Sequence, residues 1–411
     1  MSTSLQWITG RQSMLVVEPI LIVDACVQHT LFLLLVAVLC VVTAVVMFKA
    51  LSNKKNKVKS CVDSTHNASD MRGKTVVVTG ANAGIGFETA LELSRLGARV
   101  IVACRCPSKG LAAAEAIRGL TGNERVEFAL LDVGSLSSVR RFADKLVASE
   151  ERLDVLVNNA GITAPRQKRL TSEGVEVTLA TNFLGPFLLT NLLLDVLRHS
   201  APSRVVNVTS ALYRLGRVPW DYLDAAGGSA NVEYPGVECT YASSKLLLNM
   251  FTVRMARRLE GTGVTCNAVH PGVVATCFNQ KEPGLRHFLW NSFLQTFGTS
   301  PRKGSRGSVY LSSSPTLRDV TGKYFVSRRQ SSWSSKVLDE EVTCRVWSRS
   351  EELICSVLVG TDASEGTLRS DIGTWKPTAS LKVANCDGVK ESHPDERAKS
   401  SVWNEAQDFE L

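Results

Sequence analysis

From Lys74 onward, short runs of β-branched residues alternate with longer amphipathic segments. This alternation is typical of parallel strands joined by crossover helices. The short runs predict strands at residues 75–78, 99–103, 126–131, 155–157, 204–209, 264–269 and 323–326. The segments between them predict helices at residues 87–96, 111–119, 139–149, 175–197 and 241–260. This order predicts an α/β fold, a doubly wound parallel sheet of about seven strands with helices on both faces and right-handed crossovers.

One long apolar run precedes this pattern. Residues 31–48 read LFLLLVAVLCVVTAVVMF, and only Thr43 among them is polar. At about 1.5 Å per residue, such a helix covers most of the roughly 30 Å hydrocarbon core of a bilayer. The core of a signal peptide is the alternative, but the run is long, begins far from the N-terminus and has no small-residue cleavage site after it. We therefore predict a single-pass transmembrane helix that is retained.

The basic residues around this run predict its orientation. Arg11 is the only lysine or arginine before it, and five lysines follow it: Lys49, Lys54, Lys55, Lys57 and Lys59. The positive-inside rule then places residues 1–30 in the lumen and the rest of the chain in the cytosol, and we expect the membrane to be the endoplasmic reticulum. Residues 49–71 form a basic linker, and 72–359 form the globular domain. Residues 360–411 are polar and aperiodic, so we expect a disordered tail.

The composition excludes some classes of partner. The chain has 411 residues, 44% of them apolar and 21% charged, so it can bury a full core. Its formal net charge of +8 includes no long basic run apart from the lysines after residue 48, so we expect no nucleic-acid partner. The eleven cysteines are an odd number and lack zinc-type spacing. We predict reduced thiols, no disulfide framework and no metal site.

A glycine-rich segment follows the first predicted strand and reads Thr79-Gly80-Ala81-Asn82-Ala83-Gly84-Ile85-Gly86. The backbone must turn sharply here and open a helix, and a Cβ would hinder its close approach to a phosphate. The helix N-terminus also offers free N–H groups and the positive end of its dipole. The segment therefore predicts a dinucleotide cradle, although its Gly-x-x-x-Gly-x-Gly spacing differs from the usual Gly-x-Gly-x-x-Gly.

A second motif, Tyr241-Ala242-Ser243-Ser244-Lys245, lies at the start of a predicted helix. A tyrosine loses its proton near pH 10, so it needs a nearby positive charge to act at neutral pH. A lysine four residues later lies on the same helix face and can lower the pKa of the tyrosine. Alone this pair is weak evidence, but together with the glycine-rich cradle it indicates a hydride-transfer enzyme.

The two motifs together resemble the short-chain dehydrogenase/reductase superfamily, whose domain has a Rossmann-like fold. The resemblance implies that Tyr241 is the general acid/base and that Lys245 lowers its pKa and binds the cofactor ribose. It also implies that Ser210 polarises the substrate oxygen and that Asn182 holds a proton-relay water, although a packing asparagine would look the same. The cofactor site that it implies combines Tyr241 and Lys245 with Gly80, Asn82, Gly84, Ile85, Gly86, Asp132, Asn159, Pro271, Gly272 and Thr276.

The end of the second predicted strand bears on cofactor choice. An enzyme that uses NAD usually has an acidic residue there, which binds the ribose 2′-hydroxyl. This chain has Ala103-Cys104-Arg105 instead. Arg105 suits a 2′-phosphate, and Lys109 adds positive charge, so we predict NADP(H). A surface arginine without a ligand is the alternative.

Within the superfamily, Asn207-Val208-Thr209-Ser210, His270-Pro271-Gly272 and the N-terminal anchor resemble the retinol dehydrogenase group. The resemblance covers about residues 73–359 and implies that domain 72–359 is catalytic. It further implies a lipophilic alcohol or carbonyl as substrate, such as retinol, retinal or a lipid aldehyde. Pro186 departs from the group, which commonly has a histidine there, and the gap between Ser210 and Tyr241 is long.

Three further questions stay open in the sequence. The enzyme activity could instead be that of a steroid dehydrogenase, or the fold could be a catalytically silent scaffold. Apolar residues after the sixth predicted strand form either a lid or ordinary helix packing: Phe278, Leu285, Phe288, Leu289, Trp290 and Phe293. A homodimer is possible through the long helices near Val175 and Tyr241, where members of the superfamily often pair.

Overall fold

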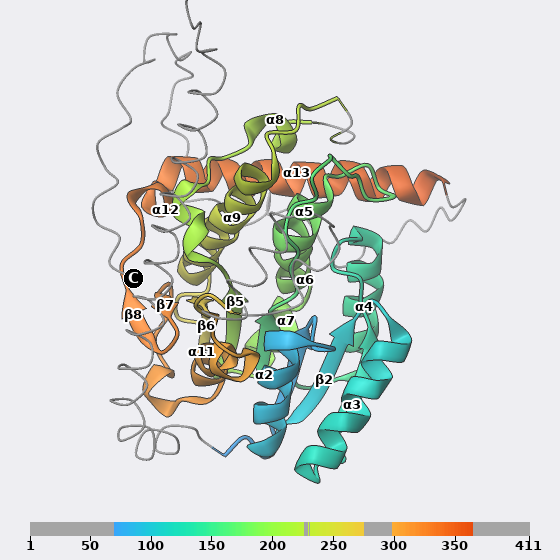
Figure 1. Ribbon diagram of the computed structural model, residues 1–411, viewed down its shortest axis with the longest axis vertical. Coiled ribbons are helices and arrows are strands. Elements are labelled where there is room, and N and C mark those ends of the chain that lie inside the picture. Colours follow the sequence, from blue (N-terminus) through green and yellow to red (C-terminus); the bar gives the residue numbers. More distant parts are fainter. Residues whose placement is uncertain (1–69, 226–228, 230, 275–297, 365–411) are drawn as a thin grey trace, which may run out of the picture. The chain divides into compact units, whose positions relative to one another are not determined.

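The computed structural model describes residues 70–225, 229, 231–274 and 298–364, and within them an eight-stranded sheet (Figure 1). The strands are β1 (Thr75–Thr79), β2 (Arg99–Cys104), β3 (Val126–Leu130), β4 (Val155–Asn158), β5 (Ser203–Val208), β6 (Val264–His270), β7 (Tyr324–Val326) and β8 (Arg329–Ser331). Their spatial order is β3-β2-β1-β4-β5-β6-β7-β8. Strands β1 to β7 are parallel and correspond to the seven predicted strands.

Strand β8 was not predicted, and it pairs antiparallel with β7. A tight turn joins the two strands, and Ser327 in that turn has a φ of 55°. The three residues of β8 are all polar, so they show no alternation of apolar and polar positions. This edge strand therefore could not be predicted from the hydrophobic pattern.

Helices cover both faces of the sheet, which gives three layers (Figure 1). On one face lie α2 (Gly84–Arg95), α3 (Pro107–Thr121) and α11 (Pro301–Ser313). On the other face lie α4 (Leu136–Ser149), α6 (Gly185–Leu192) and α9 (Val237–Arg258). Both faces of the central strands are buried, because Val76 and Val78 belong to one core and Val77 to the other. Burial on both faces explains why the strands are continuous β-branched runs.

Shorter elements connect these layers. They are α5 (Val177–Leu179), α7 (Leu194–His199), α8 (Trp220–Leu223), α12 (Ser335–Leu338) and the 3₁₀ turns Ala211–Leu215 and Pro315–Leu317. The turn Ala211–Leu215 and helix α8 follow β5, and both lie in the long gap between Ser210 and Tyr241.

The helix predicted over residues 175–197 is divided in the structure. Helix α5 leads into a π-helical turn, Ala180–Leu184, which is followed by α6 and then α7. Pro186 provides a physical reason for the irregular turn, because it has no N–H with which to bond the carbonyl of Asn182, four residues earlier. The loss of that bond favours a local change of helix type at Asn182.

A long C-terminal helix, α13 (Glu340–Ser364), is the largest element that was not predicted. It contacts α9, α4 and α8 (Figure 1). Its Trp347 lies against Phe187 and Phe251, with ring centroids 4.7 Å and 5.7 Å away. The pattern that marks its buried face was present in the sequence at Val346, Trp347, Ser350, Leu353, Ile354 and Val357. Helix α13 ends beyond residue 359, the predicted end of the domain.

Some predictions fall outside the described residues. They concern the apolar run 31–48, most of the linker, Thr276, the apolar residues from 278 to 293 and the tail after residue 364. Within the described part of the chain, no helix combines the length and the apolar character that crossing a membrane requires.

Candidate active site

The turn between β1 and α2 excludes side chains at the predicted cradle. Gly80 and Gly84 have φ values of 65° and 61°, in the left-handed region that favours glycine. A Cβ on Gly86 would lie 2.3 Å from Nδ2 of Asn159 and 2.5 Å from the carbonyl oxygen of Gly80. The close packing of these backbones leaves room for no residue except glycine at position 86.

Helix α2 begins without a cap. Its N-cap residue is Ala83, whose side chain accepts no hydrogen bond, and its first turn contains no acidic residue. The first N–H groups of the helix are therefore available to an anion, as at phosphate-binding helix ends. Asn82 lies half-buried in the turn, and Ile85 packs near Gly304 of α11. The residues of the turn fit the pyrophosphate of a dinucleotide.

Thr79 and Asn159 join the carboxyl ends of β1 and β4. Oγ1 of Thr79 accepts hydrogen bonds from the backbone N–H groups of Asn159 and Ala160, each 3.0 Å long. Nδ2 of Asn159 donates to the carbonyl of Thr79 over 2.8 Å. The structure thus places Asn159 beside the cradle, where its side chain holds the turn.

The residues predicted to set cofactor choice lie at the carboxyl end of β2. Arg105 and Lys109 are exposed at the start of α3, and no acidic residue among those described pairs with Arg105. Asp132 follows the neighbouring strand β3, where its Oδ1 accepts from the N–H of Gly134 over 3.0 Å. These three side chains lie at the same edge of the sheet as the cradle, because the strands are parallel.

Tyr241, Lys245 and Ser210 lie together at this edge. Tyr241 and Lys245 occupy successive turns of α9, and Ser210 follows β5. The Ser210 side chain acts on the Tyr241 hydroxyl and lowers its pKa, against the effect of burial. Nζ of Lys245 donates to the carbonyl of Val208 over 3.0 Å and lies 6.0 Å from the centroid of the Tyr241 ring.

Burial controls the acidity of this group. It raises the pKa of Tyr241 to about 12, against the opposing effect of the hydrogen bond with Ser210. It lowers the pKa of Lys245 to about 8. The pKa of Tyr241 is raised overall because burial has a larger effect than the hydrogen bond with Ser210. At neutral pH the tyrosine therefore carries its proton.

Asn182 lies in the π-helical turn and is fully buried. Its Oδ1 accepts from the N–H of Ile162 over 2.8 Å, and its Nδ2 donates to the carbonyl of Ile162 over 2.9 Å. A Cβ on Gly161 would lie 3.2 Å from Oδ1 of Asn182 and 3.4 Å from Nζ of Lys245. The structure thus brings Asn182 close to Lys245, while its role in holding a water stays a prediction.

A buried polar chain beneath the site was not predicted. Nδ2 of Asn158 donates to Oγ1 of Thr190 over 3.0 Å and to Oδ1 of Asn207 over 2.8 Å. Nδ2 of Asn207 donates in turn to Oγ1 of Thr252 in α9 over 2.9 Å. An asparagine inside each of two apolar strands was the sequence signal for this connection between β4, β5 and α9.

The end of β6 carries the remaining predicted residues. Pro271 and Gly272 are half-buried directly after the strand, and Gly272 has a φ of 86°. The neighbouring His270 is neutral at pH 7, because burial lowers its pKa to about 4. Thr276 lies outside the described residues, so its predicted place near the nicotinamide stays a prediction.

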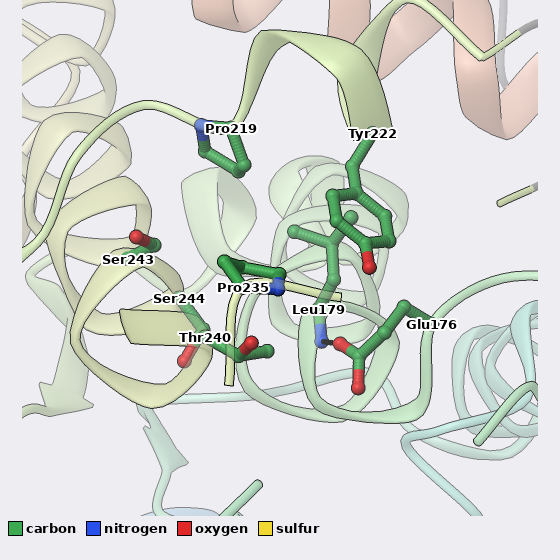
Figure 2. Close-up of a pocket in the computed structure, with 8 residues that line it drawn as sticks. All are labelled: Glu176, Leu179, Pro219, Tyr222, Pro235, Thr240, Ser243 and Ser244. Atoms are coloured by element: carbon green, nitrogen blue, oxygen red, sulfur yellow. Dashed lines mark hydrogen bonds between the residues drawn. The ribbon is translucent and has the colours of Figure 1, made fainter. Parts of the chain in front are cut away.

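A small pocket lies behind the first turns of α9 (Figure 2). Its walls include Glu176, Leu179, Pro219, Tyr222, Ser243 and Ser244, and neither Tyr241 nor Ser210 lines it. Glu176 is fully buried, and burial raises its pKa. Its carboxylate accepts from the N–H groups of Thr178 and Leu179 over 2.9 Å and 2.7 Å. Glu176 therefore caps the short helix that leads to Asn182.

Comparisons with known proteins identify the family of the chain. The family model described as short chain dehydrogenase matches residues 74–221 and 227–284. The chain is also 43% identical over 290 residues to retinol dehydrogenase 13 from Homo sapiens, a match that covers 69% of this chain and 85% of that protein. The chain belongs to the short-chain dehydrogenase family.

Further matches place the chain within this family. It is 42% identical over 300 residues to retinol dehydrogenase 14 from Homo sapiens, covering 69% of this chain and 87% of that protein. A solved structure from Mycobacterium paratuberculosis, titled as a putative uncharacterized protein, is 33% identical, with a TM-score of 0.56, and covers 70% of this chain and 96% of that one. The chain is thus an oxidoreductase of the short-chain dehydrogenase family, and it resembles the retinol dehydrogenase group.

Proposed function

We propose that this chain is an NADP(H)-dependent oxidoreductase that transfers a hydride between the nicotinamide and a lipophilic alcohol or carbonyl, with retinol and retinal as the favoured pair. The observation that carries the proposal is the grouping of Tyr241, Ser210 and Lys245 beside a turn from which side chains are excluded. We also propose that residues 31–48 anchor the chain in the endoplasmic reticulum membrane, with the catalytic domain in the cytosol.

The proposed chemistry assigns one role to each side chain. A nicotinamide cofactor held by the β1–α2 turn supplies the hydride for reduction or accepts it for oxidation. During reduction, the Ser210 hydroxyl donates a hydrogen bond to the substrate oxygen and so polarises the carbonyl. The Tyr241 hydroxyl then gives its proton to that oxygen. Lys245 stabilises the resulting phenolate through its positive charge.

At neutral pH the Tyr241 hydroxyl is protonated, because burial raises its pKa to about 12, so it can serve as the proton donor in carbonyl reduction. The raised pKa also makes it a weaker acid, so proton transfer depends on the stabilisation of the phenolate by Lys245. Alcohol oxidation requires the phenolate instead, so it should become faster as the pH rises from 7 toward the pKa of Lys245, above which the stabilising charge is lost. Lys245, with a pKa of about 8, keeps most of its charge at pH 7.

The choice of NADP(H) rests on Arg105 and Lys109. Both are exposed at the carboxyl end of β2. The strand end has no acidic residue that could bind the ribose 2′-hydroxyl of NAD. A guanidinium binds a phosphate through two parallel hydrogen bonds, which a ribose hydroxyl cannot offer.

The choice of a lipophilic substrate rests on the relatives' names and on the surface near Ser210. Leu212 and Leu215, in the turn that follows Ser210, are 50% and 65% exposed, and Val273 after β6 is 50% exposed. Exposed leucines and valines beside a catalytic serine suit an apolar substrate.

We also infer that any homodimer uses a surface other than the one that α13 buries, because Phe187 of α6 and Phe251 of α9 lie against Trp347.

A substrate panel tests this proposal. Membranes that contain the full-length chain would receive retinal, a steroid ketone or a medium-chain aldehyde, each with NADPH and with NADH. We expect the highest kcat/KM with retinal and NADPH. Preference for the steroid ketone would identify a steroid dehydrogenase, and no turnover of any compound would contradict an enzymatic role.

The Tyr241→Phe variant tests the catalytic assignment in the same assay. Loss of the hydroxyl removes the proton donor, and we expect kcat/KM to fall by roughly 10²- to 10⁴-fold. Tyr310→Phe is the matched control, because Tyr310 lies on α11, on the other face of the sheet from α9. Near-normal turnover by Tyr241→Phe would refute the assignment.

A further inference from the structure

The two serines between Tyr241 and Lys245 bond to different parts of the molecule. Both lie on the same side of α9 and line the pocket behind its first turns (Figure 2). Ser244 is 1% exposed and Ser243 is 8% exposed, so neither contacts bulk solvent appreciably. Each hydroxyl nevertheless has a hydrogen-bond partner outside its own turn, and the two partners belong to different segments of the chain.

Ser244 connects the catalytic tyrosine with Asn182. Its Oγ donates to the carbonyl of Tyr241 over 2.7 Å and accepts from Nδ2 of Asn182 over 3.0 Å. The amide of Asn182 is bonded on both sides to the backbone of Ile162. A continuous set of hydrogen bonds therefore runs from the segment after β4 through Asn182 and Ser244 to the backbone that bears Tyr241.

Ser243 connects the same helix with the segment that follows Ser210. Its Oγ accepts from the N–H of Arg217 over 3.2 Å. One residue earlier, Gly216 packs against the helix backbone so closely that a Cβ would lie 2.5 Å from the carbonyl of Ala242. Arg217 lies two residues after the turn that carries the exposed Leu212 and Leu215. Ser243 thus fixes the base of the surface proposed to meet the substrate.

We propose that these serines divide the positioning of the site between them. Ser244 sets Tyr241 and Asn182 relative to each other and so controls the chemical step, whereas Ser243 sets the segment after Ser210 and so controls substrate binding. Neither serine touches the reacting atoms, and both are positioning residues. The assignment rests on the proposed function for its kinetic consequences, but the hydrogen bonds that it invokes exist independently of any substrate.

The kinetic test compares Ser244→Ala with Ser243→Ala in membranes that contain the full-length chain. We expect Ser244→Ala to lower kcat by about ten- to hundredfold, since a small misplacement of a catalytic group has effects of this size. Its KM should change by less than about threefold. Ser243→Ala should show the reverse pattern, with KM raised by about threefold or more and kcat nearly unchanged. Equal kcat in Ser244→Ala and the unaltered chain would overturn the role of Ser244, and an unchanged KM in Ser243→Ala would overturn that of Ser243.

A double variant shows whether Ser244 acts through Asn182. If it does, Ser244→Ala combined with Asn182→Ala should reduce kcat no further than the more damaging single variant. Multiplicative losses would mean that the two residues act separately, contrary to the proposal. Ser244→Cys has a weaker hydrogen-bonding group of similar shape, so it should give a smaller loss in the same direction and serves if Ser244→Ala does not fold.

Amide hydrogen exchange supplies a readout that needs no activity. Ser244→Ala should speed exchange at Ile162 by about tenfold, because the N–H of Ile162 is held by Asn182, and should leave Arg217 unaffected. Ser243→Ala should speed exchange at Arg217 and leave Ile162 unaffected. Unchanged exchange at Ile162 in Ser244→Ala would overturn the connection. If the unaltered chain turned over no substrate, the proposed function would fail, while the exchange pattern would still decide the assignment of the two serines.

Discussion

Lys245→Met tests the electrostatic description of the site without reference to any substrate. Lys245 is 4% exposed, and burial lowers the pKa of its ammonium from 10.5 to about 8. The folded chain therefore releases this proton at a lower pH than the unfolded chain does. Between pH 8 and pH 10.5 the unfolded chain binds more protons, so the free energy of unfolding rises with pH in this window.

The size of the effect follows from the shift. A difference of 2.5 pKa units, 10.5 minus 8, corresponds to about 3 kcal/mol. The cost of burying the charge is fully present below pH 8 and is removed by pH 10.5. Methionine has no charge, so the stability of Lys245→Met relative to the unaltered chain should be highest below pH 8 and should fall by about 3 kcal/mol across the window. The lost hydrogen bond to Val208 adds an offset of about 1 kcal/mol that does not depend on pH.

Urea unfolding of the full-length chain in detergent, followed by tryptophan fluorescence at several pH values, measures this difference. The same substitution at the exposed Lys145 of α4 is the control, and its effect should not vary across the window. A stability difference between Lys245→Met and the unaltered chain that stays constant within about 1 kcal/mol would refute a buried ammonium with a lowered pKa. Lys245→Met should also lack activity, because the phenolate of Tyr241 loses its stabilising charge.

The remaining predictions concern the cofactor and the membrane. Gly86→Ala should weaken NADPH binding by at least about tenfold in a fluorescence titration, because the added Cβ would lie 2.5 Å from a backbone oxygen. Unaltered affinity would show that the backbone of the turn can shift to accommodate a side chain. Arg105→Asp should reverse a roughly ten- to hundredfold preference for NADPH, measured as kcat/KM with each cofactor. Equal use of the two cofactors by the unaltered chain would contradict the role of Arg105, and an unchanged ratio in the variant would move that role to another residue such as Lys109. Protease added to intact microsomes should digest the catalytic domain, whereas a glycan on Asn67, in the sequon Asn67-Ala68-Ser69, would overturn the proposed orientation.

The parts of the site that the sequence predicted are those whose geometry is local. Gly80 and Gly86 lie in one turn, and Tyr241 and Lys245 lie four residues apart on one helix, so spacing alone indicated their arrangement. The partners of Asn182 lie 20 and 62 residues away in the chain, and only the folded backbone brings them together. The net pKa shift of Tyr241 could not be predicted for a related reason, because the extent of burial depends on the whole tertiary structure.

The same distinction applies to the fold. Seven strands were predicted because each is an apolar run with β-branched residues, whereas β8 contains only Arg329, Gln330 and Ser331. Helix α13 has an apolar periodicity at Val346, Trp347, Leu353, Ile354 and Val357, which is a local signal in the sequence. The break at Asn182 depends on Pro186, and a proline near the start of a helical segment does not by itself distinguish a π-helical turn from a continuous helix.

The position of α13 affects how changes in the coding sequence would act on the protein. Every predicted site residue lies before residue 277, yet Trp347, Ile354 and Val357 of α13 complete the core that supports them. A nonsense or frameshift change after the last site residue but before Glu340 would leave a full set of functional side chains on an incompletely covered domain. Truncated chains of this kind should be recognised as misfolded and degraded, so they would be lost through low abundance rather than through an altered active site.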